Sequence, residues 1–478
     1  MEPNPLTPFP KKEGGTEPST AGTQIPGVAS SPSLFRRGVG ERFFPSLRPQ
    51  LVLVLLWALY FHPLILHPAQ ALRAIDLDQL TGPLAKALTR VVPGSAAGAA
   101  LSWVVALHVL AAGQFAYCYA RSRALNEVGS VVAAAGFMLS SKWMTHLLLA
   151  GHSVTAGLAW LPLVLLFAER ATDRRSVWSA LCAMTASALL TLETHPQWTL
   201  YAGVFAVAWT FPRERERIPR WFLCWAGAIG VGVALSALHL VPAMGAGPWA
   251  AQNAGLEASG ALNIGLPTAL ALLGPSLSYS PPYSWEMQGI FGVYWLAAAI
   301  AAPLVAGKVA RGQFGVLCGL VAFALGGAVL VDWLPGFNLF RVPTRMLLIV
   351  SFPLAFLAGT TTHALTQSAW SLETRSALAR GFRRVVIFVG LPAIVGMWFA
   401  DGHVWWAFAA YWAAAVFALP LFLRVLQNQT VRSRTRTGLW IVILLADLVA
   451  PIAVLPAVKP QAEPSPIPVS PEPLNARP

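Results

Sequence analysis

The chain has 478 residues, of which 56% are hydrophobic and 11% are charged, with 19 tryptophans and a mean hydropathy of +0.59. Ordinary soluble domains have about 25% charged residues, so this composition excludes that class and indicates a polytopic membrane protein. The formal charge of +13 comes from basic residues scattered between apolar segments, which argues against a nucleic-acid partner.

Both ends of the chain lack apolar runs of membrane length. Residues 1–50 are rich in Pro, Gly, Ser and Thr and carry six basic residues, so we expect a disordered cytoplasmic tail. No stretch of signal-peptide type precedes Leu51, so we expect the first span to direct insertion itself. Residues 457–478 are Pro-rich and are expected to form a second disordered tail. The transmembrane domain is therefore predicted to occupy residues 51–456.

Between the tails, thirteen apolar segments approach the roughly 20 residues that a helix needs to cross about 30 Å of hydrocarbon. The predicted fold class is thus all-α, a polytopic membrane protein with about 13 transmembrane helices. The expected spans are residues 51–67, 99–120, 125–141, 152–169, 177–193, 196–211, 220–242, 289–307, 313–331, 346–365, 385–400, 404–423 and 438–456.

The distribution of basic residues predicts the orientation. With the N-terminus in the cytoplasm, 25 of the 33 Lys and Arg residues fall in the tail and loops on the cytoplasmic side, as the positive-inside rule requires. Most of the ionisable residues that do not belong to these basic loops lie on the other side, close to the predicted membrane boundary. We therefore expect any functional site at the outer face. The outer segments are residues 68–98, 141–152, 193–197, 243–288 and 332–345.

Two carboxylates, Asp76 and Asp78, lie in the first outer segment. The leucines that follow recur at steps of three and four, which predicts an interfacial helix lying on the membrane surface. Gly82-Pro83 interrupts this stripe, so a turn and a helix starting near Pro83 is an equal alternative. The acids are candidates for a general base or for ligands of a divalent cation, Mg²⁺ or Mn²⁺. The alternative is that they are solvated acids on an interfacial helix.

Arg341 and Arg345 lie four residues apart before the tenth expected span. A guanidinium matches phosphate oxygens in charge and geometry, so both are candidate substrate-binding residues. Outer arginines are also conspicuous because the positive-inside rule disfavours them there. Anchoring to lipid headgroups is the alternative interpretation.

Three further ionisable residues lie where expected spans meet outer loops. His152 and His195 are candidate substrate-binding residues, for orienting a phosphate or an acceptor, with helix capping as the alternative. Glu193 is the second candidate catalytic acid, because a carboxylate at the edge of an apolar span normally has a partner or a water-filled cavity. Tryptophans such as Trp143 and Trp198 fall near span ends, which is typical of an interfacial belt.

Several motifs resemble the bacterial YfhO-like membrane proteins of the GT-C glycosyltransferase superfamily. They are Ala150-Gly151-His152 running into Ala159-Trp160-Leu161-Pro162, then Thr194-His195-Pro196-Gln197, and then Phe340-Arg341-Val342-Pro343-Thr344-Arg345. The resemblance covers most of residues 51–365. Family members often continue the first outer loop with a Trp-Asn-Pro-Tyr and Gly-Gly stretch, whereas here Val91-Val92-Pro93-Gly94 passes almost directly into the second span.

The resemblance implies a glycosyltransferase of the bacterial inner membrane. Its donor would be a polyprenyl-phosphate sugar from the bilayer, and its acceptor an envelope glycan or lipid at the outer face. The superfamily places an essential acid in the first outer loop, which by position matches Asp76 or Asp78. Two other classes stay open, a transporter or flippase for lipid-linked saccharides and a catalytically silent protein of the same architecture. No convincing internal repeat favours a transporter.

Overall fold

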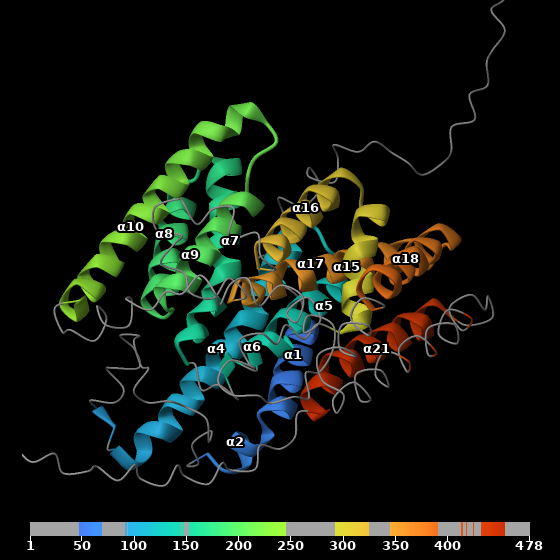
Figure 1. Ribbon diagram of the computed structural model, residues 1–478, viewed down its shortest axis with the longest axis horizontal. Helices are drawn as coiled ribbons and strands as arrows, with labels where there is room; N and C mark the ends of the chain where they lie inside the picture. Colours follow the sequence, from blue (N-terminus) through green and yellow to red (C-terminus); the bar gives the residue numbers. More distant parts are fainter. Residues whose placement is uncertain are drawn as a thin grey trace, which may run out of the picture. The chain divides into compact units, whose positions relative to one another are not determined.

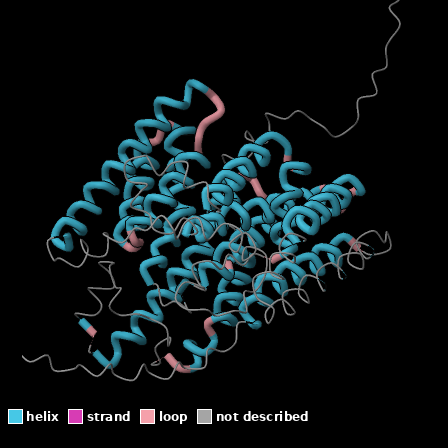
Figure 2. The backbone as a smooth tube through the Cα atoms, in the orientation of Figure 1, coloured by secondary structure: helices cyan, strands magenta, loops and turns pink. Residues whose placement is uncertain are grey.

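The structure is a computed structural model, and it describes part of the chain. The described residues are 47–68, 91–92, 94–144, 146–147, 153–244, 292–324, 345–390, 413, 417, 424 and 432–454. Their regular structure consists of helices, and they contain no strand (Figure 2). The predicted all-α class is thus confirmed for this part of the chain. The expected interfacial helix, the C-terminal tail and all but the last four residues of the N-terminal tail lie outside it.

Most of the described helices follow expected spans, whereas most residues of the expected spans 385–400 and 404–423 lie outside the described residues. The N-terminal half contains α1 (Leu47–Tyr60), α2 (His62–Leu66), α4 (Gly94–Ser122), α5 (Glu127–Met138), α6 (Ser141–Met144), the 3₁₀ helix η4 (Ser153–Trp160), α7 (Leu161–Arg174), α8 (Val177–Leu192) and α9 (Pro196–Trp209). After the short 3₁₀ turn η5 (Arg215–Arg217) come α10 (Ile218–Met244), α15 (Val293–Val305), α16 (Gly307–Ala324), α17 (Met346–Gln367), α18 (Leu372–Val385), the π-helical turn η9 (Val386–Gly390) and α21 (Ser433–Val454).

Three described helical stretches, Ala96–Ser122, Arg215–Leu235 and Met346–Gln367, are long and apolar enough to cross a membrane. They differ in how much of each is enclosed by the rest of the protein. Within the apolar 18-residue window of each stretch, the buried share is 56% in the first, 17% in the second and 94% in the third. The second stretch exposes large apolar side chains, with Phe222 64% and Leu223 69% exposed. Such a surface is costly in water and suits hydrocarbon. These helices support the membrane character of the chain, whereas the number of thirteen spans stays a prediction.

The buried helix α17 packs most closely against α5. A Cβ on Gly129 would collide with the backbone oxygen of Gly359, and a Cβ on Gly359 would collide with Gly129 and Ala133. Two helical turns further along α5, a Cβ on Gly136 would collide with the Trp295 ring and Ala355. Small residues thus let the two backbones approach, which is how helices commonly associate in a membrane.

Two sets of helices meet at α4 and α9. One set is α7, α8 and α10, which contact one another and lie side by side in Figure 1. The other is α5, α15, α16 and α17, with α18 packed along α15. Helix α4 contacts both α5 and α7, and α9 contacts both α7 and α17. The two polar clusters described below lie at the ends of α4 and α9.

The first turn of α15 is capped by a side chain from the last described helix. Its N-cap residue, Gly292, has no side chain that can accept a hydrogen bond. Asp447 of α21 takes this role, because its Oδ2 accepts from the backbone N–H of Tyr294 at 2.7 Å and of Trp295 at 3.4 Å. Asp447 is only 5% exposed. A carboxylate at a helix N-terminus interacts favourably with the helix dipole.

The belt interpretation is wrong for two tryptophans. Trp143 is 1% exposed and Trp198 is 2% exposed, so both are packed inside the helix bundle. Trp143 stacks on Phe137 with ring centroids 5.2 Å apart, and its Nε1 donates to the backbone oxygen of Thr155 at 3.1 Å. The position of a tryptophan near the end of a predicted span therefore does not show whether its side chain faces the membrane interface or the protein core.

Candidate functional site

A group of polar side chains gathers where α8 ends and where α9 and α17 begin. Glu193 is the C-cap residue of α8, and His195 is the N-cap residue of α9. Pro196 follows at the first helical position, where its missing N–H costs nothing, as the sequence predicted. Arg345 directly precedes α17. We call Glu193, Thr194, His195, Gln197, Trp198 and Arg345 the Arg345 cluster.

Arg345 is held by two side chains from the first turn of α9. Its Nη1 donates to Gln197 Oε1 at 2.7 Å, and its guanidinium carbon lies 5.0 Å from the centroid of the Trp198 ring. Gln197 Nε2 in turn donates to the Tyr201 hydroxyl at 3.2 Å, one turn further along α9. A cation over an indole face is attracted by the ring quadrupole. These contacts fix the direction in which the guanidinium points.

Two histidine rings approach Trp198 edge-on. The His195 ring centroid lies 5.7 Å from that of Trp198, and the fully buried His146 ring lies 5.6 Å away. His195 Nδ1 also accepts from the backbone N–H of Gln197 at 3.3 Å, so His195 does cap α9. The capping alternative for His195 is therefore supported by a contact, while its role in substrate binding stays a prediction.

The 3₁₀ helix η4 closes this corner of the bundle. The backbone N–H of Gly157 donates to the Glu193 carbonyl at 3.3 Å, and a Cβ on Gly157 would collide with Thr194. Thr194 is 4% exposed, and its hydroxyl has no hydrogen-bond partner in the described part of the chain. A glycine at 157 is thus required for η4 to approach the cluster.

The structure brings two of the seven predicted site residues, His195 and Arg345, against the same Trp198 ring from two loops that are far apart in the sequence. A third, Glu193, lies two residues before His195, at the end of α8. The other four predicted site residues are Asp76, Asp78, His152 and Arg341, which lie outside the described residues.

Sequence reasoning missed the buried cation Lys142 of α6. Its side chain is fully buried, and α6 contacts α17. A lysine inside a helix bundle of this composition is unusual, because burying an ammonium group is costly unless it is compensated. The sequence pattern that could have revealed it is a single Lys within an otherwise apolar stretch on the predicted outer side, where basic residues are disfavoured.

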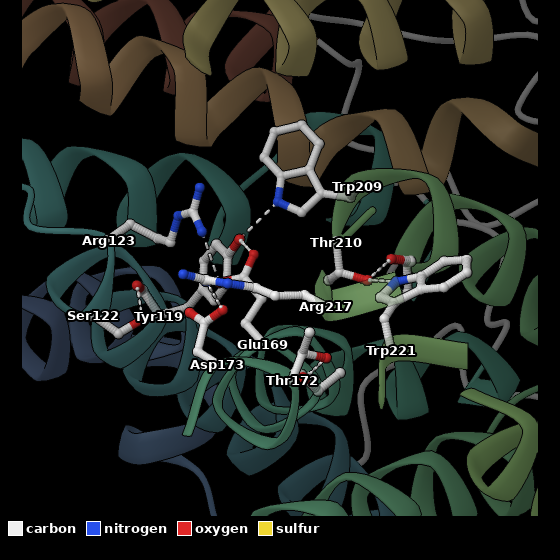
Figure 3. Close-up of polar contacts among 12 residues, drawn as sticks. Tyr119, Ser122, Arg123, Glu169, Thr172, Asp173, Trp209, Thr210, Arg217 and Trp221 are labelled. Atoms are coloured by element: carbon white, nitrogen blue, oxygen red, sulfur yellow. Dashed lines mark hydrogen bonds and ion pairs between the residues drawn. The ribbon is translucent and has the colours of Figure 1, made fainter. Parts of the chain in front are cut away.

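A second polar group, which we call the Glu169 cluster, consists of Tyr119, Arg123, Glu169 and Trp209 (Figure 3). Arg123 Nη1 lies 3.0 Å from Glu169 Oε2, and the Tyr119 hydroxyl donates to Glu169 Oε1 at 2.9 Å. Trp209 Nε1 donates to the Tyr119 hydroxyl at 2.7 Å. Both carboxylate oxygens of Glu169 therefore have partners, and α4, α7 and α9 are joined through one network.

The electrostatics of this ion pair keep Arg123 charged. Burial lowers the pKa of the Arg123 guanidinium, but the neighbouring Glu169 carboxylate and Tyr119 raise it by more, so the pKa lies above its usual value. The side chains of Arg123 and Glu169 are 17% and 13% exposed. A neighbour that is about one-third exposed, Arg217, pairs with Asp173 beside this network (Figure 3).

The two clusters lie at opposite ends of α9. His195, Gln197 and Trp198 are at its start, and Trp209 is its last residue. At a rise of 1.5 Å per residue, these ends are about 20 Å apart. The contacts at each end join residues that the predicted topology places on the same side of the membrane. This grouping agrees with helices of alternating direction, and the side that faces the cytoplasm stays a prediction.

Within the described residues, no group of three His, Cys, Asp or Glu side chains is arranged to hold a metal ion. Asp76 and Asp78, which the sequence indicates as candidate ligands of a divalent cation, lie outside the described residues.

No family model matches the chain, and no characterised protein or solved structure gives a match.

Proposed function

We propose that the chain is an integral-membrane glycosyltransferase of the GT-C type, which moves a sugar from a polyprenyl-phosphate donor to an envelope glycan or lipid. The observation that supports this best is the Arg345 guanidinium, which is oriented by Gln197 and by Trp198, the ring that His195 also contacts. An oriented guanidinium suits a phosphate ester, whose oxygens it matches in charge and in planar geometry. The proposed location is the bacterial inner membrane, with a cytoplasmic N-terminus and the Arg345 cluster at the outer face.

In this proposal, Arg345 and Arg341 bind the donor phosphate as it becomes the leaving group. His195 and His152 orient the donor or the acceptor. Asp76 or Asp78 accepts the proton of the acceptor hydroxyl, since that hydroxyl is a weak nucleophile, or binds a divalent cation at the phosphate. Glu193 is the second candidate for the base, because it lies two residues before His195 in the same cluster.

The test is transfer of a labelled sugar from a polyprenyl-phosphate donor by the purified protein in nanodiscs. A catalytic base contributes on the order of 10² to 10⁴ in rate. If Asp76 or Asp78 is that base, replacing it with Asn is therefore expected to abolish detectable transfer. Glu373→Gln is the matched control, because Glu373 is an exposed acid on α18. Activity that survives in the double Asn variant moves the assignment to Glu193, which Glu193→Gln then tests.

A transporter or flippase for lipid-linked saccharides is the second candidate, and one observation favours it. Gly292, the N-cap residue of α15, lines the same cavity as Ser351 and Leu354, so α15 begins level with the second and third turns of α17. Helices that begin inside the bundle are typical of transporters. Movement of a labelled lipid-linked saccharide across proteoliposomes without any transfer would favour this function. A protein that does neither is the catalytically silent alternative.

A further inference from the structure

A small cavity lies where the break between α5 and α6 meets α15, α17 and α21. It is lined by the hydroxyl-bearing residues Ser140, Ser141 and Ser351 and by the apolar side chains of Trp295, Leu354 and Leu448. The lining of the cavity is therefore partly polar and partly apolar.

The polar part of this lining contains a hydroxyl whose hydrogen bonding is incomplete. Ser140 is 2% exposed, and its Oγ has no hydrogen-bond partner among the described residues. Ser351 is 1% exposed, and its Oγ donates to the Leu347 carbonyl of its own helix at 3.5 Å, a long hydrogen bond. Buried polar atoms in proteins nearly always have a partner, often an ordered water. Because the Ser140 hydroxyl lines the cavity and has no partner in the described part of the chain, it points to a ligand there.

The size of the cavity decides what that ligand is. About 10 Å³ is open to the centre of a water molecule. A cavity that holds one water needs roughly 10–15 Å³ by this measure, and the water needs two to four polar partners. The space therefore accepts one water and is too small for a sugar, a phosphate or a lipid chain.

We propose that one ordered water occupies this cavity and hydrogen-bonds to Ser140 Oγ and Ser351 Oγ, with Ser141 supplying a further hydroxyl to the same lining. The water connects the start of α6 to α17, beside the first turn of α15 that Asp447 caps. This site is separate from the Arg345 cluster and does not depend on the proposed reaction.

The experiment measures the apparent Tm of nanodisc-embedded Ser140→Ala, Ser351→Ala and the double variant. If the water is present, Ser140→Ala removes one of its partners, and the Tm is expected to fall by roughly 1–4 °C. If the cavity is dry, the same change removes an unpaired buried hydroxyl, so the Tm stays the same or rises. Ser102→Ala is the control, since the Ser102 hydroxyl donates to Gly98 O of its own helix, away from the cavity.

The double variant tests the bridge itself. One water shared by Ser140 and Ser351 makes the two single effects non-additive, because losing either partner already weakens the site. Additive effects, or a Tm that does not fall in Ser140→Ala, overturn the proposal. A cryo-electron-microscopy map that resolves waters gives an independent check, since a peak within hydrogen-bond distance of both hydroxyls is expected, and an empty cavity contradicts it.

Discussion

Gln197 and Arg345 are 148 residues apart in the sequence, and their side chains meet at 2.7 Å. This hydrogen bond joins the first turn of α9 to the start of α17, the most deeply buried of the three membrane-length helices. It therefore sets the position of the cation on which the proposed phosphate recognition depends.

Replacing Arg345 with Lys is expected to weaken binding of the polyprenyl-phosphate donor by about tenfold or more. Lys keeps the charge but loses the planar guanidinium that contacts Gln197 and Trp198 together. Donor binding in nanodiscs measures the effect, and Arg311→Lys, at an exposed position of α16, is the matched control. Equal binding by Arg345→Lys and wild type would leave anchoring to lipid headgroups as the better explanation.

The Arg123–Glu169 ion pair is expected to be sensitive to the loss of one partner. Glu169→Gln or Arg123→Gln should lower the free energy of unfolding by about 3–5 kcal/mol, since each leaves a largely buried charge without its counter-ion. The double change Arg123→Met with Glu169→Leu should recover part of the loss, because it removes both charges.

Arg217→Gln is the control for this comparison, because the Arg217–Asp173 pair is about one-third exposed on both sides. Exposed pairs contribute about 0–1 kcal/mol. Chemical denaturation in detergent micelles provides the measurement. A double variant less stable than both single variants would show that the pair is not the origin of the effect.

The close contact of α5 and α17 predicts opposite results for two Gly→Ala changes. At Gly359 the new methyl group collides with Gly129 and Ala133, so the helices must separate, and stability should fall by about 1–3 kcal/mol. At Gly203 of α9 no atom lies within 4 Å of the new methyl group. There the better helix propensity of Ala should leave stability unchanged or raise it by up to about 1 kcal/mol. Thermal unfolding of the two variants in one detergent compares them directly.

The predicted orientation can be tested at Arg215, which is exposed in the turn before α10. In a variant with the four native cysteines replaced, Arg215→Cys should react with a membrane-impermeant maleimide only after the cells are permeabilised. The reason is that the basic cluster at this turn is expected in the cytoplasm. Labelling of intact cells at this position would reverse the topology and place the Arg345 cluster inside.

Local patterns in the sequence predicted the helices well, because length and hydrophobicity determine where a membrane-sized helix can form. The expected span 346–365 corresponds to α17 (Met346–Gln367), and 196–211 corresponds to α9 (Pro196–Trp209). Residues 372–384, expected in a cytoplasmic loop, instead belong to α18 (Leu372–Val385), whose apolar side packs on α15. Its alternation of arginines and apolar residues indicates an amphipathic helix, but hydropathy alone does not distinguish that from a loop.

The partners in the sites could not be predicted, because they depend on contacts between distant segments. The order of residues did predict that Glu193 and His195 lie at helix ends. It gave no indication that Arg345 would lie over Trp198, or that Trp198 would be buried. Asp447 was visible as a carboxylate in an apolar span, but its partner, the first turn of α15, lies about 150 residues earlier in the chain.

The cap that Asp447 provides has a consequence for biosynthesis. The ribosome completes α15 long before it reaches residue 447, so the N–H groups of Tyr294 and Trp295 must wait for α21 before they gain their carboxylate. Until then the start of α15 lacks its acceptor in an environment where unpaired amides are costly. We therefore expect the final placement of α15 to be a late, post-insertion event, and a chain that ends before α21 to be recognised and degraded by membrane quality control.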